Sequence, residues 1–175
     1  NKALANRNIP LGIEAGLALA RMGIRTLLIT QSLDCIGRMS CNPAIGGIAK
    51  GNLVREVDAL GGEMGRLIDA TMIQFRMLNR SRGPAVQAPR AQADKQAYAA
   101  LAARTLQLQP GLELLQDTVV DFSLDASGSR VEAVVTERGR RVGCRAVVLT
   151  TGTFMEASLF IGDWSLPGGR LAGAG

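Results

Sequence analysis

The sequence predicts an α/β fold in which a parallel sheet is combined with a small β-meander. Three observations support this prediction. Aliphatic residues dominate, with 47% of residues hydrophobic and only 3% aromatic, which suits helices packed on a sheet better than a sandwich. An amphipathic helix that stops at Gly23 is followed by an apolar strand, residues 26–30. A second continuous apolar strand, residues 146–150, runs into a Thr-Gly turn.

Length and composition limit the possible functions. With 175 residues, the chain is one domain or a large part of one. Its three cysteines, Cys35, Cys41 and Cys144, lack metal-ligand spacing and there is no histidine, so we expect no metal site. No apolar run approaches the roughly 20 residues of a membrane span, and no signal-peptide pattern opens the chain. We therefore expect a cytoplasmic protein that enters no membrane. The net charge of +5 permits an anionic partner such as RNA.

The other elements follow from periodicity and turn residues. Helices are expected over residues 52–60, 63–70 and 90–106, and strands over residues 72–78, 112–116, 118–124, 131–137 and 142–145. The first strand of a βαβ unit should precede Gly12, but residues 1–8 are polar and contain no apolar run. Either the unit is truncated, or residues 1–11 are an atypical or foreign segment that is not the native partner of the rest.

A glycine-rich turn follows the thiol of Cys41 in the segment Ser40–Gly51. Gly46 and Gly47 let the backbone approach a ligand closely, and the first amides of the helix beyond the turn should be unpaired donors that favour negative charge. In that field the pKa of the Cys41 thiol should be lowered, which raises the fraction of reactive thiolate. Alternatively, Cys41 is a small buried apolar residue and the glycines only punctuate a loop.

The order of helix, strand, long excursion, meander and apolar strand is typical of a Rossmann-like FAD-binding domain, here an incomplete one. In a parallel sheet, ligands bind at the carboxyl ends of the strands. The loops after Thr30, around Cys41 and after Thr150 should therefore meet there. The alternative is that these are the strand-loop-glycine junctions found in any α/β protein.

Five blocks of sequence occur in order, at residues 40–51, 54–62, 83–86, 89–94 and 149–154. Together they resemble the GidA/MnmG family of flavoproteins, and the likeness extends from about Gly12 to Arg170. The resemblance implies an FAD-dependent enzyme that installs an aminomethyl or carboxymethylaminomethyl group at carbon 5 of the tRNA wobble uridine. It also implies methylenetetrahydrofolate as the carbon donor, NADH bound outside this chain, the GTPase partner MnmE, and a homodimer.

The resemblance implies roles for individual residues as well. Cys41 matches a thiol near the flavin and the target base, where it would act as a nucleophile or as an acid/base group. The residues implied to contact the cofactor are Gly12, Thr30, Gln31, Ser40, Asn42, Pro43, Val119, Thr151, Gly152 and Thr153. For Thr30, Val119 and Thr151, the alternative is an ordinary strand residue of the core.

The most prominent cluster of basic residues is Arg80, Arg82, Arg90 and Lys95. One interpretation is contact with tRNA, because RNA phosphates are bound by several spaced cations. The other interpretation is a solvated surface that binds nothing.

The chain departs from the family pattern at both ends. The family has three glycines ahead of Gly12, whereas this chain reads Arg7-Asn8-Ile9-Pro10-Leu11, where side chains would obstruct a pyrophosphate and Pro10 lacks an amide donor. Residues 171–175 form an atypical tail. We therefore expect residues 12–170 to be a partial FAD-binding domain that is inactive alone. The alternatives are another FAD-dependent oxidoreductase and a non-catalytic RNA-binding fragment.

Overall fold

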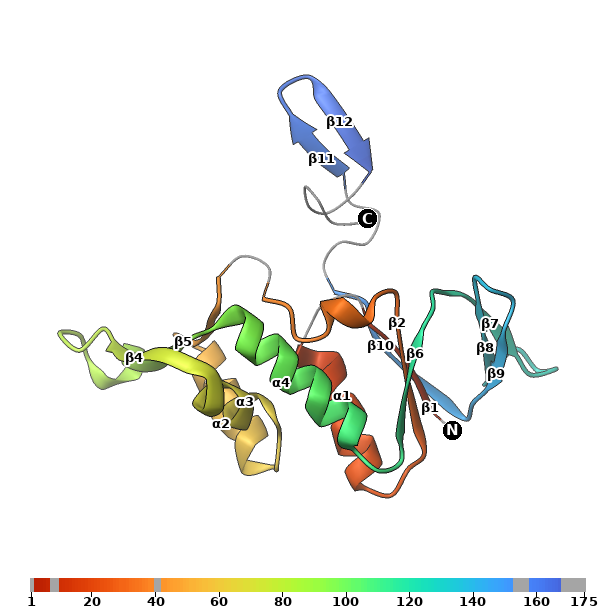
Figure 1. Ribbon diagram of the computed structural model, residues 1–175, viewed down its shortest axis with the longest axis horizontal. Coiled ribbons are helices and arrows are strands. Elements are labelled where there is room, and N and C mark those ends of the chain that lie inside the picture. The colour runs from red at the N-terminus through yellow and green to blue at the C-terminus, as the bar shows by residue number, and fades with distance from the viewer. Residues whose placement is uncertain (1, 7–9, 40–41, 153–157, 168–175) are drawn as a thin grey trace.

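The computed structural model describes residues 2–6, 10–39, 42–152 and 158–167. At its centre is a four-stranded parallel sheet with the strand order β10-β1-β2-β6 (Figure 1). The strands are β1 (Lys2–Asn6), β2 (Thr26–Thr30), β6 (Leu112–Gln116) and β10 (Ala146–Thr150). The predicted α/β class is confirmed, and the predicted bounds of β2, β6 and β10 are correct.

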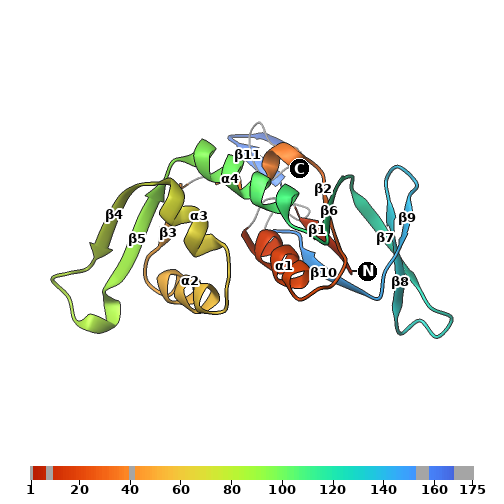
Figure 2. The same cartoon turned by 60° about the horizontal axis from the view of Figure 1, so that its bottom comes forward.

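Helices cover one face of the parallel sheet and an antiparallel meander covers the other (Figure 2). The helices α1 (Pro10–Arg21) and α4 (Lys95–Leu108) share a core with Leu28 of β2. The next residue, Ile29, faces a second core formed with the meander strands β7 (Val119–Leu124), β8 (Val131–Thr136) and β9 (Arg141–Gly143). Because successive strand residues point to opposite faces, one apolar strand serves both cores.

A smaller antiparallel sheet lies at the end of the molecule away from the meander (Figures 1 and 2). Its strand order is β3-β5-β4, and the strands are β3 (Ala44–Gly46), β4 (Met72–Leu78) and β5 (Ala88–Ala93). The helices α2 (Lys50–Ala59) and α3 (Met64–Thr71) pack against it. Short 3-10 turns occur at η1 (Leu33–Cys35) and η2 (Pro84–Val86), and β11 (Ser158–Ile161) pairs with β12 (Trp164–Pro167).

The first strand of the βαβ unit was expected before Gly12, and the alternative that the unit is truncated there is wrong. β1 pairs in parallel with β2 on one side and with β10 on the other, so it is an inner strand of the sheet. The polar residues of this segment gave no apolar pattern that would predict a strand. A strand that is paired on both sides is stabilised by backbone hydrogen bonds as well as by its side chains, and those bonds leave no signal in the sequence. Whether residues 1–11 are foreign to the rest of the chain stays a prediction.

The prediction of one helix over residues 90–106 is also wrong at its start. Residues 88–93 form β5, and α4 begins only at Lys95. The boundary is set by Asp94, whose carboxylate accepts hydrogen bonds from the N–H groups of Gln96 at 2.9 Å and Ala97 at 3.0 Å. Asp94 is therefore the N-cap residue of α4. The Ala- and Gln-rich composition of this segment does not by itself show at which residue the helix begins.

Other differences concern the edges of the sheets. β3 and the β11–β12 hairpin were not predicted. A continuous apolar strand such as β10 is typically buried in a parallel sheet, but Val148 is 36% exposed and Leu149 is 57% exposed. In the described part of the chain β10 is one of the two edge strands of this sheet, so it has a neighbour on one side only.

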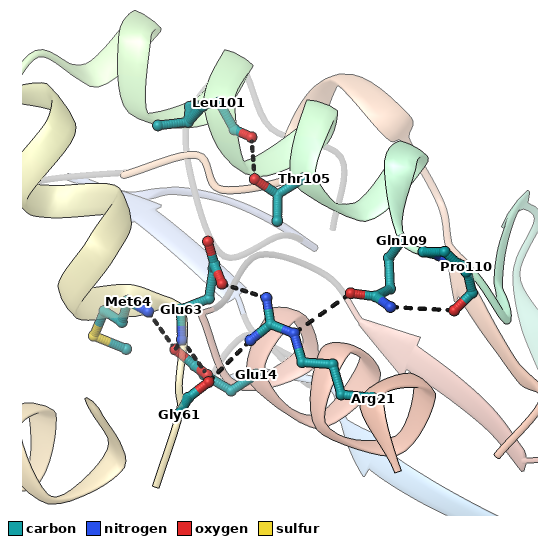
Figure 3. A network of polar contacts seen from close by, with 9 residues as sticks. All are labelled: Glu14, Arg21, Gly61, Glu63, Met64, Leu101, Thr105, Gln109 and Pro110. Atoms are coloured by element: carbon teal, nitrogen blue, oxygen red, sulfur yellow. Dashed lines mark hydrogen bonds and ion pairs between the residues drawn. The ribbon is translucent and has the colours of Figure 1, made fainter. Parts of the chain in front are cut away.

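A partly buried polar junction joins α1 to the start of α3 (Figure 3). The Glu14 carboxylate accepts hydrogen bonds from the N–H groups of Glu63 at 2.9 Å and Met64 at 2.5 Å. Such amides have no partner within their own helix. Arg21 pairs with the Glu63 carboxylate at 2.5 Å and donates to the Gly61 carbonyl at 2.9 Å. The junction therefore holds the turn between α2 and α3 against α1.

Replacing Glu14 by alanine should lower the free energy of unfolding by about 2 kcal/mol, because two partly buried amides lose a charged acceptor. Glu14→Gln keeps one acceptor oxygen and should lose less. Urea denaturation of a full-length protein that carries this chain measures both effects. Equal stability of Glu14→Ala and the parent would show that water replaces the carboxylate without cost.

Candidate functional site

The four parallel strands end in one row at the same edge of the sheet. Asn6 is the register partner of both Thr30 and Thr150, and Thr30 is the partner of Gln116. From β1, the chain adds β2 and then β6 on one side of the sheet, and later adds β10 on the other side. The direction of strand addition therefore reverses between β1 and β10, which makes this the topological switch point of the sheet. In open parallel sheets, ligands bind in the crevice at such a point.

The helix that follows β1 begins beside this edge. α1 starts at Pro10, and Gly12 is buried in its first turn. A helix N-terminus favours negative charge such as a phosphate. Pro10 supplies no amide donor, so an anion placed there would depend on the other amides of this turn.

Two predicted cofactor residues lie at the end of β2. Thr30 is only 5% exposed, and its hydroxyl donates to the Ser32 carbonyl at 3.2 Å. Gln31, directly beyond the strand, is half-buried. A ligand above this strand end would therefore reach the Gln31 amide more readily than the Thr30 hydroxyl.

Three more predicted residues border the same edge. Val119, half-buried, begins β7 just beyond the end of β6. Thr151 and Gly152 follow β10 directly and are half-buried, and Gly152 has a φ of 80°, in the region that favours glycine. The structure thus brings Gly12, Gln31, Val119, Thr151 and Gly152 to one edge of the sheet. Thr153 lies outside the described residues.

Asp117 is a residue of this edge that the sequence analysis did not single out. It is 5% exposed, and its N–H donates to the Thr30 carbonyl at 2.9 Å. Burial tends to raise the pKa of its carboxyl, but the Thr118 amide, the Thr136 hydroxyl and Arg138 outweigh burial, and the pKa is lowered below its ordinary value. Of its two carboxylate oxygens, Oδ1 accepts a hydrogen bond from the Thr118 N–H at 2.9 Å, and the buried Oδ2 has no hydrogen-bond partner in the described part of the chain. The only sequence signal was an isolated acidic residue between two apolar strands.

The segment that follows Cys41 is anchored on β5. The Pro43 carbonyl accepts a hydrogen bond from the Ala93 N–H at 2.7 Å, and the Gly47 N–H donates to the Pro89 carbonyl at 2.9 Å. Asn42 is exposed and Pro43 is half-buried. Ser40 and Cys41 lie outside the described residues, so their predicted roles stay predictions.

The prediction that the first amides after the glycine turn are unpaired is wrong. Within the first turn of α2, the Gly51 N–H donates to the Gly47 carbonyl at 2.8 Å, and the Asn52 and Leu53 N–H groups donate to the Ala49 carbonyl, each at 3.1 Å. Positive φ at Gly46, Gly47 and Ala49 folds these carbonyls back toward the helix. A ligand at the turn would meet the field of the helix rather than unpaired amides.

The predicted basic cluster is spread over the β4–β5 hairpin and the start of α4 (Figure 1). Arg80 and Arg82 are exposed in the turn after β4, where their carbonyls accept hydrogen bonds from the Gln87 amide. Arg90 lies on β5, and Lys95 is the exposed first residue of α4. The four residues therefore do not form one compact cluster. Arg76, on β4, was not predicted and lies directly opposite Arg90.

The described part of the chain contains no group of three or more Cys, His, Asp or Glu side chains that could hold a metal ion. No helix in the described ranges has the length and apolar character needed to cross a bilayer.

The strand order, the helix after the first strand and the meander on the opposite face together define a dinucleotide-binding α/β domain. A sequence profile described as "Glucose inhibited division protein A" matches residues 11–174. The chain therefore belongs to the GidA family.

Individual relatives agree with this assignment. The chain is 63% identical over 161 residues to the tRNA uridine 5-carboxymethylaminomethyl modification enzyme MnmG of Borreliella burgdorferi (strain ZS7), a match that covers 92% of this chain and 26% of the relative. The crystal structure of Aquifex aeolicus GidA superposes with a TM-score of 0.89 at 50% identity, covering 98% of this chain and 28% of that one. PqsL, a probable FAD-dependent monooxygenase from Pseudomonas aeruginosa, shares the fold, with a TM-score of 0.56 at 18% identity over 84% of this chain and 42% of that one.

Proposed function

We propose that this chain is the FAD-binding part of a flavoenzyme that installs a (carboxymethyl)aminomethyl group at carbon 5 of the wobble uridine, position 34, of tRNA. The observation that carries the proposal is its 63% identity, over 92% of the chain, to an enzyme named for this modification. The chain spans about a quarter of that relative's length, with 26% covered. The proposal therefore includes features outside the chain: an NADH site, methylenetetrahydrofolate as the carbon donor, the GTPase partner MnmE, a homodimer and a cytoplasmic location.

The residues at the sheet edge fit FAD. Gln31 is half-buried just beyond β2, where a ribose hydroxyl would be held by an uncharged polar group. Gly12 lets the first turn of α1 pack closely, the Val119 backbone would meet the adenine ring, and Thr151 with Gly152 would cover the cofactor. Bound there, FAD would supply hydride transfer. Ser40, Asn42, Pro43 and Thr153 complete the proposed set of cofactor contacts, together with Thr30.

Cys41 is the proposed catalytic residue. Its thiolate would add to carbon 6 of the uracil ring, so that a sulfur–carbon bond forms and the electron pair of the 5,6 double bond makes carbon 5 nucleophilic. Carbon 5 then bonds to the methylene carbon of the folate donor, while one carbon–nitrogen bond of that donor breaks and its electron pair goes to nitrogen. Loss of the carbon 5 proton to a base and departure of the thiolate restore the double bond. In the alternative role, Cys41 transfers protons and forms no bond to the base.

The β4–β5 hairpin and the first residue of α4 provide the proposed tRNA contacts. Arg80, Arg82, Arg90 and Lys95 would neutralise phosphates that are spaced along the RNA backbone. Three of these residues are exposed and Arg90 is half-buried, so all four are accessible to a ligand.

Titration with FAD tests the proposal most directly. A full-length protein that carries this chain should bind FAD saturably in the micromolar range and show a flavin absorption spectrum. Gln31→Ala should weaken binding about fivefold, because one hydrogen bond is lost. Gln107→Ala is the matched control, since Gln107 is exposed on α4 away from the strand ends. Equal FAD affinity of the Gln31 variant and the control would contradict the assigned ribose contact.

The same protein distinguishes the alternatives. FAD binding without modification of tRNA would indicate another FAD-dependent oxidoreductase, which the shared fold with PqsL also permits. RNA binding without FAD would indicate a non-catalytic RNA-binding module. In that case we would attribute the loss of FAD binding to the segment Arg7–Leu11, which has larger residues at positions where the family has glycines.

A further inference from the structure

Two arginines face each other across the β4–β5 hairpin. Arg76 is the direct register partner of Arg90, and Gln74 is the partner of Gln92. Directly opposite residues on an antiparallel pair project to the same face, with Cβ atoms about 5 Å apart. The hairpin therefore presents two guanidinium groups and two amide groups on one face of the sheet.

These side chains line a hollow. It has a volume of about 170 Å³ and is bordered by Gln74, Arg76, Leu78, Arg90 and Gln92. The row of residues continues onto β3, where Gly46 is the register partner of Arg90. Gly46 belongs to the glycine turn that follows Cys41 in sequence, so Arg90, one of the residues that border the hollow, lies beside that turn.

Like charges placed directly opposite one another on a sheet are destabilising. Within the described ranges, the ion pairs are Arg21 with Glu63 and Arg141 with Glu132, so neither Arg76 nor Arg90 has a carboxylate partner there. The same part of the chain shows no hydrogen bond from either guanidinium. The two guanidinium groups and two amide groups around the hollow supply several N–H donors and an unbalanced positive charge. Phosphate oxygens are bound by groups of this kind.

We propose that Gln74, Arg76, Arg90 and Gln92 form a subsite for one phosphodiester of the RNA substrate, a proposal that rests on the tRNA-modifying function proposed above. The hollow lies on a largely exposed hairpin, which suits a polymer backbone. Arg80 and Arg82 are exposed in the turn of the same hairpin and extend the positive charge beyond the hollow. The subsite would fix the RNA backbone near β3, which follows Cys41 in sequence, leaving the bases to other contacts.

RNA affinity measured at several salt concentrations tests the subsite. The probe is a fluorescently labelled RNA stem-loop with the sequence of the tRNA anticodon arm, bound to the full-length holoenzyme in KCl. Arg76→Gln and Arg90→Gln should each weaken binding about tenfold, and the slope of log K against log salt should fall by about 0.7–0.9. Arg76→Lys keeps the charge but loses the two-pronged guanidinium, so its affinity should be intermediate.

Arg140→Gln is the matched control. Arg140 is exposed in the turn between β8 and β9, at the opposite end of the molecule (Figure 2). Its removal changes the net charge equally, so we expect less than about a twofold loss and an unchanged slope. FAD absorbance and thermal melts of every variant confirm folding.

The outcomes separate the subsite from the function. If the parent binds the RNA and both glutamine variants behave as Arg140→Gln does, the subsite is overturned while the tRNA function stands. If the glutamine variants lose FAD and retain RNA affinity, the hollow serves the cofactor and the subsite is overturned as well. If the parent fails to bind or modify tRNA, the proposed function is overturned and the subsite with it.

Discussion

Replacing Cys41 by serine in a full-length protein that carries this chain should lower the rate of tRNA modification by about 10³-fold. The serine hydroxyl is nearly isosteric with the thiol, but it is not ionised at neutral pH and is a poor nucleophile toward a uracil ring. The measurement is single-turnover formation of the modified uridine, with FAD content and RNA affinity recorded in parallel. Both of these should be unchanged, because the substitution removes reactivity rather than binding.

Cys35 provides the control for this experiment. It is a free, half-buried thiol on η1, and its sulfur receives only a long contact of 3.9 Å from Arg38. Cys35→Ser should leave the rate within about twofold of the parent, as is usual for a substitution without a structural mechanism. Equal activity of Cys41→Ser and Cys35→Ser would exclude both proposed roles of Cys41.

Replacing Gly46 by alanine should lower the free energy of unfolding by about 3 kcal/mol. Gly46 has a φ of 113°, and a Cβ added there would lie 2.2 Å from the Pro89 carbonyl oxygen and 2.8 Å from the Arg90 Cα. Both neighbours belong to the backbone of β5, so β3 and β5 would have to separate. Since this pairing anchors the segment after Cys41, modification activity should fall together with stability.

Gly47 is the matched control for the Gly46 substitution. Its φ is 99°, but nothing lies within 4 Å of an added Cβ. Gly47→Ala should therefore cost only the backbone strain, about 1–2 kcal/mol. Urea denaturation of the two variants measures the difference. If Gly46→Ala is no less stable than Gly47→Ala, β3 and β5 can separate at Gly46 without loss of stability. Their close contact would then not anchor the segment after Cys41.

The candidate site was only partly predictable. The sequence placed Gln31, Thr151 and Gly152 at strand ends because apolar strands and the turn residues after them are local patterns, whereas Val119 was named only through the family resemblance. Asp117 was not predicted because the features that distinguish it are not local. The pKa of its carboxyl depends on burial and on Thr136 and Arg138, which lie about 20 residues later in the chain. Arg76 was not predicted because residues 90–93 of β5 were expected to be part of a helix, and a helix would give Arg76 no cross-strand partner.

By itself, the sequence determined the α/β class, the bounds of β2, β6 and β10, and membership of the GidA family, since these depend on composition, periodicity and contiguous motifs. Only the tertiary structure decided that Lys2–Asn6 is an inner strand, that the first amides of α2 are paired, and that Arg76 faces Arg90. The position of β1 and the pairing of Arg76 with Arg90 depend on backbone hydrogen bonds between different strands. The pairing of the first amides of α2 depends on the φ angles of the glycine turn before it. Neither the partner of a strand nor the φ of a glycine is encoded in local hydrophobic periodicity.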